Sequence, residues 1–573
     1  MELPEIRAVM TQFLDTSDLA AAALVCKSWN ASFNPPLYSA IQWYNHPKKP
    51  SKEGVSANAD HVRELYFYTE ISEFPLQACT RIEVLQIGYW QKDPNIWRQL
   101  STFVRRNPMI KSVSAIDHDN HSSIDFMEAV SSCSGLREVH IDIRPLHRPY
   151  LETILNNANR LEALSIIAET SCPIESLEMW PCFPWLKKLR LEIKSYIPVP
   201  LQLNIIRRSP ELTTLTWRID KIDSYPASDI SELFKTHCPF IEHLNLQGEA
   251  ISDEALSRIF DNCRRVTSFH VLESRFGELA FRSLIRHFSY LQELDLRYCG
   301  RANSKMVHQI LISCPSLVSF AGVRLRAEDF MGIVKDESTG EEKMMDSQPQ
   351  DWVCTNLEFL TISICGLEGK PQEWQQLILE QLARLKKLTF LSIGPNTLSF
   401  QDSRDGVVLR LESGLDILSS LKRLTIFCLD GLWQEMDECD VRWMMKSWPE
   451  LKRVEGKLHH DKPRRLELEK ILKKKDIDLV VYFDSDDDDP DDSDYSGGSG
   501  NDEEDEEEED NGGKNNEGEN SSETENNEEE NSEEVDDDDD NDNDGDDDDD
   551  DDDDDDEEDD DDDDEEEEEE MEE

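Results

Sequence analysis

One short apolar pattern recurs along most of this 573-residue chain. It reads apolar-x-x-apolar-x-apolar, and from Leu136 to Leu317 its first positions follow one another at steps of 25, 25, 26, 29, 25, 25 and 26 residues. Chance can supply one copy but not a ladder of this regularity, and a fixed period of this length is typical of solenoid proteins. The ladder therefore constrains the fold more than any other feature of the sequence does.

Each copy of the pattern predicts a short strand, because its last two apolar residues are two apart and so lie on one strand face. The residues between copies have helical spacing instead, as Leu256, Ile259 and Phe260 do. A strand plus a helix is stable only when such units stack. We therefore predict an α/β solenoid over residues 47–482, a horseshoe with a parallel sheet on its concave side. Clear copies begin at Leu136, Leu161, Leu186, Leu212, Ile241, Val266, Leu291, Leu357, Leu388 and Leu421, and weaker ones at Val62, Ile82, Ile110, Leu317 and Leu451.

The repeats contain cysteine at recurring places. Some end in it, as in Leu296-Arg-Tyr-Cys299, and some open with Cys-Pro, as at Cys314-Pro315. With lengths near 25 or 26 residues, they resemble the cysteine-containing subfamily of leucine-rich repeats. The thirteen cysteines include no Cys-x-x-Cys, so we expect reduced core cysteines and neither a disulfide framework nor a metal site. After Leu317 the spacing widens, and residues 327–350 are expected to form a polar surface loop.

Charge is distributed very unevenly along the chain. From Asp484 onward there are 60 acidic residues and one lysine, whereas residues 1–483 contain 65 acidic and 58 basic residues. Like-charge repulsion and the lack of apolar residues predict a disordered acidic tail at 483–573. The tail can attract basic proteins such as histones, screen basic patches, or only keep the protein soluble, and the sequence leaves these alternatives open.

The expected location of the protein is inside the cell. The start, Met1-Glu-Leu-Pro-Glu5, has no basic leader before an apolar core, and no run of about 18 apolar residues occurs, so we expect no membrane association. Residues 451–475 have a net charge of +6. They suit either a two-part nuclear import signal or the cationic end of a last helix, which leaves cytoplasm and nucleus both open.

The first 46 residues have a different pattern from the repeats. Val9, Met10, Phe13 and Leu14 have helical spacing, and the following residues 15–18 (Asp-Thr-Ser-Asp) suit the N-cap of a second helix that we expect to run to about residue 29. The result would be a helical hairpin with a large apolar face. On these residues alone, a plain cap for the end of the solenoid explains the hairpin equally well.

The detail of this segment resembles the F-box. The matching elements, in order, are Leu3-Pro4-Glu5-Ile6, Phe13-Leu14, Asp18-Leu19, the run from Val25 to Trp29, and Pro35-Pro36-Leu37-Tyr38. Tyr38 stands where tryptophan is common in the family, and the helix from Leu19 is unusually rich in alanine. The resemblance implies docking to a small Skp-family adaptor, with the interface formed or supported by Leu3, Pro4, Ile6, Met10, Leu14, Leu19, Val25 and Trp29.

An F-box followed by leucine-rich repeats resembles the substrate receptors of SCF ubiquitin ligases. The resemblance implies an adaptor that links a protein target to a cullin for ubiquitination and proteasomal degradation, and that is not itself an enzyme. The sequence agrees, because it has no Gly-rich phosphate loop, no Gly-x-Ser-x-Gly elbow and no recognisable cofactor motif. Alternatives are a histone-binding, chaperone-like acidic leucine-rich protein and an activator of the nuclear-transport GTPase. The repeats of both of those contain an asparagine after the leucines, which the repeats of this chain lack.

The residues expected to face the concave surface and contact a target are of mixed charge. With both signs interspersed and no basic stripe with aromatic residues, nucleic acid is not the expected ligand of this face. An unidentified protein target fits better, although a target bound elsewhere would leave the same solvated face. The candidate target-binding residues are Arg190, Arg218, His270, Asp295 and Arg297.

Overall fold

The fold was analysed in a computed structural model. Contacts divide the chain into one unit that ends at Asp494 and a second that starts at Tyr495, and every described residue lies in the first unit. The acidic tail predicted at 483–573 lies outside the described residues. The structure describes residues 4–44, 50–69, 71, 73–88, 94–117, 124–143, 148–155, 158–169, 182–194, 199–219, 227–248, 251–335, 342–344, 349–395 and 403–481.

Among the described residues, seventeen strands form one sheet, and all the pairings between these strands are parallel. Each strand pairs with the strands before and after it along the chain, except that β12 pairs directly with β15. The strands are β1 Ala40–Trp43, β2 Glu64–Phe67, β3 Val84–Ile87, β4 Ser112–Asp117, β5 Glu138–Ile143, β6 Ala163–Glu169, β7 Lys188–Lys194, β8 Thr214–Ile219, β9 His243–Gln247, β10 Ser268–Leu272, β11 Glu293–Asp295, β12 Ser319–Arg326, β15 Phe359–Cys365, β16 Phe390–Ser392, β17 Ile426–Cys428, β18 Arg453–Glu455 and β19 Asp478–Val480.

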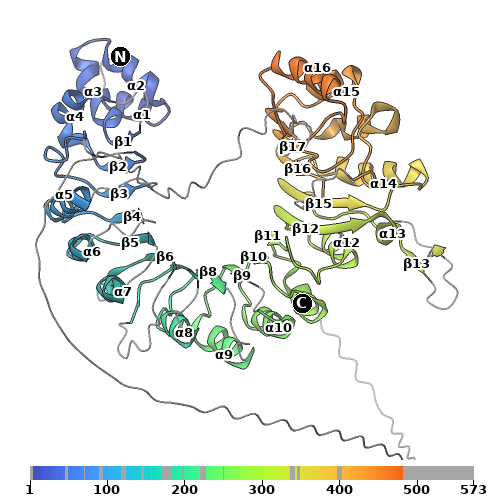
Figure 1. The fold of residues 1–573 in the computed structure, drawn as a ribbon, viewed down its shortest axis with the longest axis horizontal. Helices are drawn as coiled ribbons and strands as arrows, with labels where there is room; N and C mark the ends of the chain where they lie inside the picture. Colours follow the sequence, from blue (N-terminus) through green and yellow to red (C-terminus); the bar gives the residue numbers. More distant parts are fainter. Residues whose placement is uncertain are drawn as a thin grey trace, which may run out of the picture. The chain divides into compact units, whose positions relative to one another are not determined.

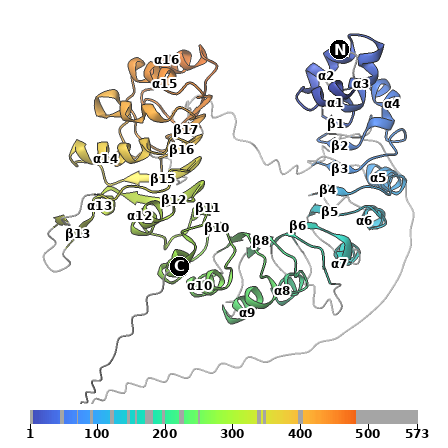
Figure 2. The same ribbon diagram turned by 180° about the vertical axis from the view of Figure 1, so that it is seen from behind.

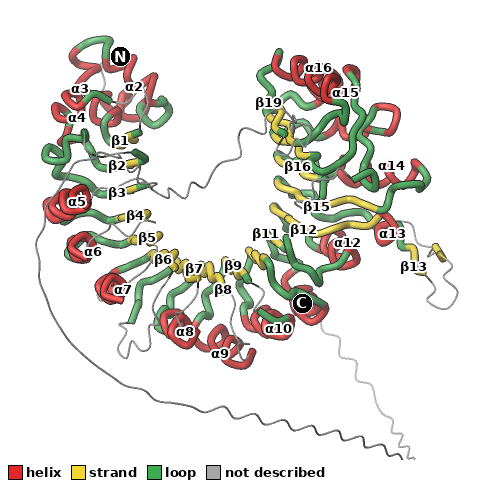
Figure 3. Tube along the Cα trace, viewed as in Figure 1, coloured by secondary structure: helices red, strands yellow, loops and turns green. Residues whose placement is uncertain are grey.

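Helices connect most of the successive strands and lie on the outer side of the array, while the strands line its inner side (Figures 1 and 3). The view from behind shows the same two layers (Figure 2). This arrangement confirms the predicted α/β solenoid with a parallel concave sheet. The helices of the solenoid are α4 Lys52–Ala57, α5 Pro94–Arg106, α6 Ile124–Ser131, α7 Arg148–Leu155, α8 Val199–Arg207, α9 Ala227–His237, α10 Asp253–Asn262, α11 Glu278–Leu284, α12 Ser304–Ser313, α13 Ala327–Phe330, α14 Gln372–Ala383, α15 Glu438–Ser447 and α16 Lys462–Lys473, with short 3-10 turns at Ala59–His61, Ala158–Arg160, Ile285–His287, Leu411–Ser413 and Leu415–Ser420.

The core is one continuous layer between the sheet and the helices. In β8, Leu215, Trp217 and Ile219 are buried and alternate with half-buried residues. The pattern positions of neighbouring repeats are in register, so Leu215 lies beside Leu189 of β7 and Leu244 of β9. Burying one such side chain contributes about 1.5–3 kcal/mol. The recurrence of the pattern thus builds the core repeat by repeat.

One repeat has a different register from the predicted one. The sequence pattern there was assigned to Leu421, Leu424 and Ile426, but Ile426 is only half-buried and Phe427 takes the core position beside Leu391 of β16. The run from Leu421 to Leu429 matches the same pattern twice, three residues apart, because all four of its core residues are apolar. The pattern itself carries no information about pairing with the flanking strands, and it is this pairing that selects the second match.

Residues 327–350 were predicted to form a polar surface loop, but their first part is a short helix, α13. Ala327 and Phe330 of α13 are buried in the main core, as is Met331. Beyond them β13 (Ile333–Lys335) pairs antiparallel with β14 (Glu342–Met344). Residues 336–341 and 345–348 lie outside the described residues. The loop prediction was wrong for the first part, where two apolar side chains among polar neighbours suffice to anchor a short helix.

The N-terminal helical module, residues 4–37, has a small core of its own. It contains three helices, α1 Pro4–Met10, α2 Thr16–Ala23 and α3 Lys27–Leu37, where the sequence predicted a hairpin of two. The expected second helix ends at Ala23, with Leu24 as its C-cap, because the chain is extended at Cys26 (φ −165°, ψ 169°) before α3 begins. Leu19, Ala22, Ala23 and Phe33 form a buried cluster separate from the solenoid core.

Candidate binding surfaces

The helices of the N-terminal helical module are held by specific local bonds. The Asp15 carboxylate accepts a hydrogen bond from the Asp18 backbone N–H at 2.8 Å, which confirms the predicted N-cap of α2. This bond and a second one from the Ser17 hydroxyl hold the pKa of Asp15 below its usual value. Arg7 of α1 is buried, and its guanidinium donates to the carbonyl and hydroxyl oxygens of Ser28 in α3. The helices of the module are thus held together by contacts on their inner faces, so their outer faces are not needed for packing within the module.

Five large apolar side chains of this module are exposed, and we call them the exposed apolar set: Ile6, Val9, Phe13, Leu24 and Val25. Phe13 is 80% exposed and Leu24 is 85% exposed. Single exposed apolar residues are common on protein surfaces, but five within twenty residues make this module a candidate interaction site.

The structure places the predicted adaptor-binding residues in two environments. Ile6 and Val25 belong to the exposed apolar set. Leu19 is buried in the module's core, and Met10, Leu14 and Trp29 pack partly buried against it. Leu3 lies outside the described residues, and Pro4 is the first residue of α1.

Three residues that the sequence analysis did not assign to the interface, Val9, Phe13 and Leu24, are exposed. Helical spacing could have identified Val9, because it lies three residues after Ile6 on the face of α1 opposite the buried Arg7. Phe13 and Leu24 lie just beyond the ends of α1 and α2, where helical spacing cannot predict which way a side chain points.

On the concave face, the predicted arginines of β7 and β8 are engaged with neighbouring acids. Arg190 is exposed, and its Nε lies 2.7 Å from Oε1 of Glu192. Arg218 Nη2 lies 3.9 Å from Oε2 of Glu273. Arg190, Glu138, His140 and Lys188 also line a shallow pocket of about 270 Å³. Burial and the nearby Arg190 lower the pKa of His140.

The other three predicted target residues lie on β10 and at the end of β11. His270 Nε2 lies 3.5 Å from Oε2 of Glu293. Asp295 is buried and forms a two-pronged ion pair with Arg297, whose Nη2 lies 2.7 Å from Oδ2 of Asp295. The hydrogen bonds that Arg297 donates to the Asp295 carboxylate raise the pKa of Arg297. Asp295 therefore orients Arg297 and presents little surface of its own.

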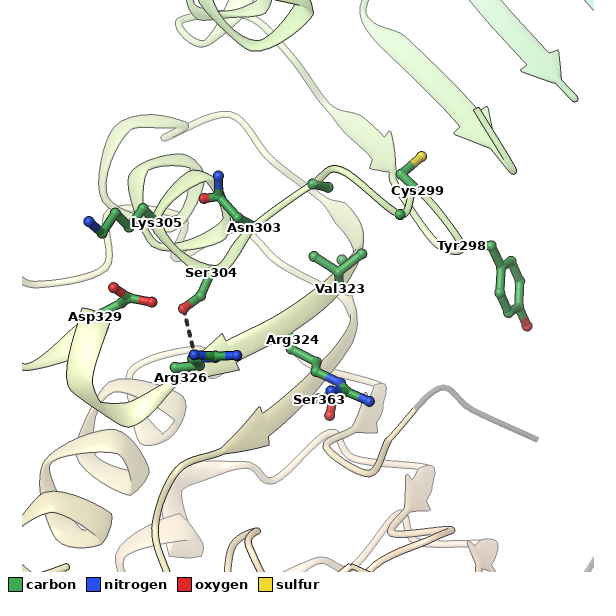
Figure 4. Close-up of a pocket in the computed structure, with 13 residues that line it drawn as sticks. Tyr298, Cys299, Asn303, Ser304, Lys305, Val323, Arg324, Arg326, Asp329 and Ser363 are labelled. Carbon is green, nitrogen blue, oxygen red and sulfur yellow. Dashed lines mark hydrogen bonds between the residues drawn. The ribbon is translucent and has the colours of Figure 1, made fainter. Parts of the chain in front are cut away.

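A larger pocket, of about 820 Å³, opens between the N-terminus of α12 and the end of β12 (Figure 4). Figure 4 shows Arg324 and Arg326 on one side of it, with Asn303 and Lys305 above them. An adjoining pocket of about 500 Å³ shares Arg324, Arg326 and Ser363. The sequence analysis did not identify either arginine, because both follow the weak repeat copy at Leu317.

The described cysteines are all free thiols, but they are not all in the core. Cys26, Cys182 and Cys439 are exposed, whereas Cys79 and Cys238 are among seven that are buried. Burial raises the pKa of Cys79 to about 11 and that of Cys238 to about 12. In the described ranges, no three His, Cys, Asp or Glu side chains gather as a metal-binding group. None of the described helices is both long and apolar enough to span a membrane.

No protein-family model matches this chain, and neither does any curated protein. Among solved structures, a leucine-rich-repeat protein of Leptospira interrogans aligns with a TM-score of 0.32 and 14% identity, covering 73% of this chain and 91% of that one. A chain from the yeast complex of Rad7 and Elc1 aligns with a TM-score of 0.33 and 13% identity, covering 83% and 92% respectively. At these values the likeness carries no functional argument. The class, a leucine-rich-repeat solenoid, rests on the repeat and on its parallel sheet.

Proposed function

We propose that this protein is the substrate-recognition subunit of an SCF-type, cullin-based ubiquitin ligase. The N-terminal helical module docks onto a Skp-family adaptor, and the concave face of the solenoid holds a protein target for ubiquitination and proteasomal degradation. The protein performs no chemistry itself; it raises the effective concentration of the target near the charged enzyme. This role places the protein inside the cell, in the cytoplasm or the nucleus.

The observation that carries the proposal is the exposed apolar set on a module with its own core. A module that served only as a solenoid cap would present a polar outer face, because terminal repeats need one for solubility. Phe13 and Leu24 are instead almost wholly in water. Burial against a partner would contribute about 1.5–3 kcal/mol for each such side chain. The same segment carries the F-box-like motif, which supports an adaptor as that partner.

The test is co-purification of the full chain with a Skp-family adaptor. We expect the wild type to bind and the triple variant Phe13→Ser, Leu24→Ser, Val25→Ser to lose binding. The matched control is Met109→Ser, because Met109 is 60% exposed but lies in the solenoid. All three proteins should melt at similar temperatures, since none of the changed side chains is in a core.

A deletion provides the second arm of the test. Removing residues 1–38 takes away the module but keeps β1, which begins at Ala40 and pairs with β2. A wild type that fails to bind the adaptor, or a deletion that binds as well as the wild type, would rule out the proposed function.

The 60 acidic residues from Asp484 onward favour a second candidate function, binding of histones or other basic proteins. Removal of residues 484–573 should abolish histone binding if this is the role of the tail. Undiminished binding of histones by the truncated protein would exclude it. The adaptor assay and the histone assay are independent, so one result does not determine the other.

A further inference from the structure

The two arginines at the end of β12 face the concave side because of a β-bulge. Ala321 pairs with Thr361 of β15 and Arg324 pairs with Ser363, so that two residues of β12 lie opposite one residue of β15. Phe320 before the bulge and Leu325 after it are both buried in the core. One extra residue reverses which positions face the core. Without the bulge, Arg324 and Arg326 would point into the core.

Neither of these guanidinium groups is neutralised by its own chain within the described residues. No ion pair or hydrogen bond joins the Arg324 or Arg326 guanidinium to another described side chain, and both residues are exposed. The only bond drawn at Arg326 in Figure 4 comes from its backbone N–H, which donates to the Ser304 hydroxyl at 2.7 Å. The predicted arginines Arg190 and Arg297, in contrast, both have carboxylate partners.

Two of the three acids near the arginines, Glu328 and Asp405, have other partners. Glu328 lies 3.4 Å from the Lys370 ammonium, and Asp405 accepts a hydrogen bond from the Glu368 backbone N–H. Asp329 lines the larger pocket on the side of Lys305 (Figure 4). The larger pocket is therefore lined by three cationic side chains and one acid, which favours an anionic ligand.

The spacing of the two arginines limits which anionic ligands can pair with both of them. Residues two apart on one strand face are separated by about 6.6 Å. An extended peptide has the same spacing between its own residues j and j+2, so each of two acidic side chains can meet one guanidinium. Arginine binds a carboxylate through two parallel hydrogen bonds, which makes the match directional. A single phosphate group would have to bridge both side chains, so it matches the spacing of the pair less well than two carboxylates do.

We propose that the β12 arginine pair, Arg324 and Arg326, binds an extended acidic segment of a target protein, with Asp or Glu at two positions separated by one residue. Each carboxylate pairs with one arginine, and the larger pocket takes the neighbouring residues of the segment. This inference rests on the proposed function in one respect: it takes the ligand to be a segment of the protein that the ligase holds for ubiquitination. Binding of the peptide itself requires no adaptor.

The experiment measures binding of the full chain to degenerate twelve-residue peptide libraries by fluorescence polarisation, at about 150 mM salt so that nonspecific attraction is screened. The first library has Asp at j and j+2, the second has Asp at j and j+3, the third has Asn at j and j+2, and the fourth has one phosphoserine. A single-stranded RNA oligonucleotide is the fifth probe. We expect the first library to bind about tenfold more tightly than every other probe.

Variants test whether the arginine pair is responsible. Arg324→Ala and Arg326→Ala should each weaken binding of the first library by about tenfold, and Arg324→Lys should weaken it less, because lysine keeps the charge but not the paired bonds. Arg264→Ala is the control, since Arg264 is exposed and is not among the residues that line either pocket. Thermal melting should be the same for all four variants, because the changed side chains are exposed.

Several outcomes would overturn the inference. Equal binding of the first three libraries, tighter binding of phosphoserine or RNA, or wild-type affinity in Arg324→Ala and Arg326→Ala would each contradict it. Binding that appears only after removal of residues 484–573 would make the chain's own acidic segment the occupant in place of a target. Failure of adaptor binding with retained peptide binding would remove the proposed function and leave this site intact.

Discussion

Arg7 of α1 and Ser28 of α3 are joined by two hydrogen bonds from one guanidinium nitrogen, 2.9 Å to the carbonyl oxygen and 2.5 Å to the hydroxyl oxygen. The same nitrogen lies 3.2 Å from the Ser32 hydroxyl. A buried charged donor that reaches across two helices holds α1 in place more firmly than the few apolar contacts of a seven-residue helix could.

Replacing Arg7 with alanine should therefore loosen α1 and leave the solenoid unchanged. A hydrogen bond from a charged donor contributes about 1.5–3 kcal/mol. Hydrogen exchange followed by mass spectrometry should show faster exchange in residues 4–14, with no change in β5 to β9, because the two cores are separate. Arg105→Ala, which removes an exposed arginine of α5, is the control. Unchanged exchange in residues 4–14 would show that Arg7 does not hold the helix.

The ion pair of Asp295 and Arg297 predicts that replacing each residue with alanine lowers the stability by a different amount. Arg297→Ala leaves the buried Asp295 carboxylate without its charged partner, whereas Asp295→Ala leaves an arginine that can turn into solvent. We expect Arg297→Ala to lower the free energy of unfolding by about 1–3 kcal/mol and Asp295→Ala to lower it by less. Urea denaturation of both variants and the double variant measures this. A larger loss for Asp295→Ala would contradict the buried-carboxylate explanation.

Stability should fall in mild acid, and His287 should contribute to the loss. Burial lowers the pKa of His287, and Arg286 adds to this, although the hydrogen bond to the Phe260 carbonyl and the nearby Asp261 oppose it. Because the folded pKa is below the unfolded value of about 6.5, the unfolded state takes up the proton first as the pH falls. The stabilisation is complete above about pH 6.5 and declines below it.

The variant His287→Gln isolates this contribution. Its free energy of unfolding should be lower than that of the wild type at about pH 7.5 and should change less between about pH 7.5 and about pH 5.5. The residual change comes from other groups, including His140 and His308, whose pKa values burial also lowers. An identical pH dependence in the wild type and in His287→Gln would exclude a role for this histidine.

Thiol reactivity should divide the cysteines by burial. The thiolate is the reactive form, so Cys26, Cys182 and Cys439 should be alkylated by iodoacetamide well before the buried Cys79 and Cys238, whose pKa values are raised. Peptide mass spectrometry after brief labelling at about pH 8 gives the order of modification. In denaturant the order should disappear. Early alkylation of Cys238 in the native protein would contradict the burial of that side chain.

The strands were predictable wherever a single reading of the pattern existed. Leu189 and Leu191, or Leu215 and Trp217, are spaced for a strand face and meet that expectation. The repeat near Leu421 was misassigned, since two overlapping readings were equally apolar. Strands β1 and β19 were missed, although β2 and β16 are no longer than they are. β1 lies within the segment predicted to be helical, and in β19 the polar Asp476 stands at the first apolar position of the pattern.

The binding surfaces were less predictable than the strands. The F-box-like segment could be located, but its exposed residues Phe13 and Leu24 depend on where α1 and α2 end. The candidate Asp295 was predicted to face a target, yet it is buried beneath Arg297. Arg324 and Arg326 became visible only when the bulge in β12 set their direction.

The sequence by itself determined the repeating strand and helix units, the parallel sheet and the change of pattern at the N-terminal helical module, because periodicity and apolar spacing are local properties of the chain. Only the tertiary structure decided which charged side chains are satisfied and which are free. Arg190 and Arg297 pair with acids two residues away, whereas Arg324 and Arg326 have no such partner among the described side chains. A one-residue bulge in β12 decides which face Arg324 and Arg326 occupy. The sequence therefore predicts a binding solenoid, while the packing of β12 against β15 selects the arginine pair on it.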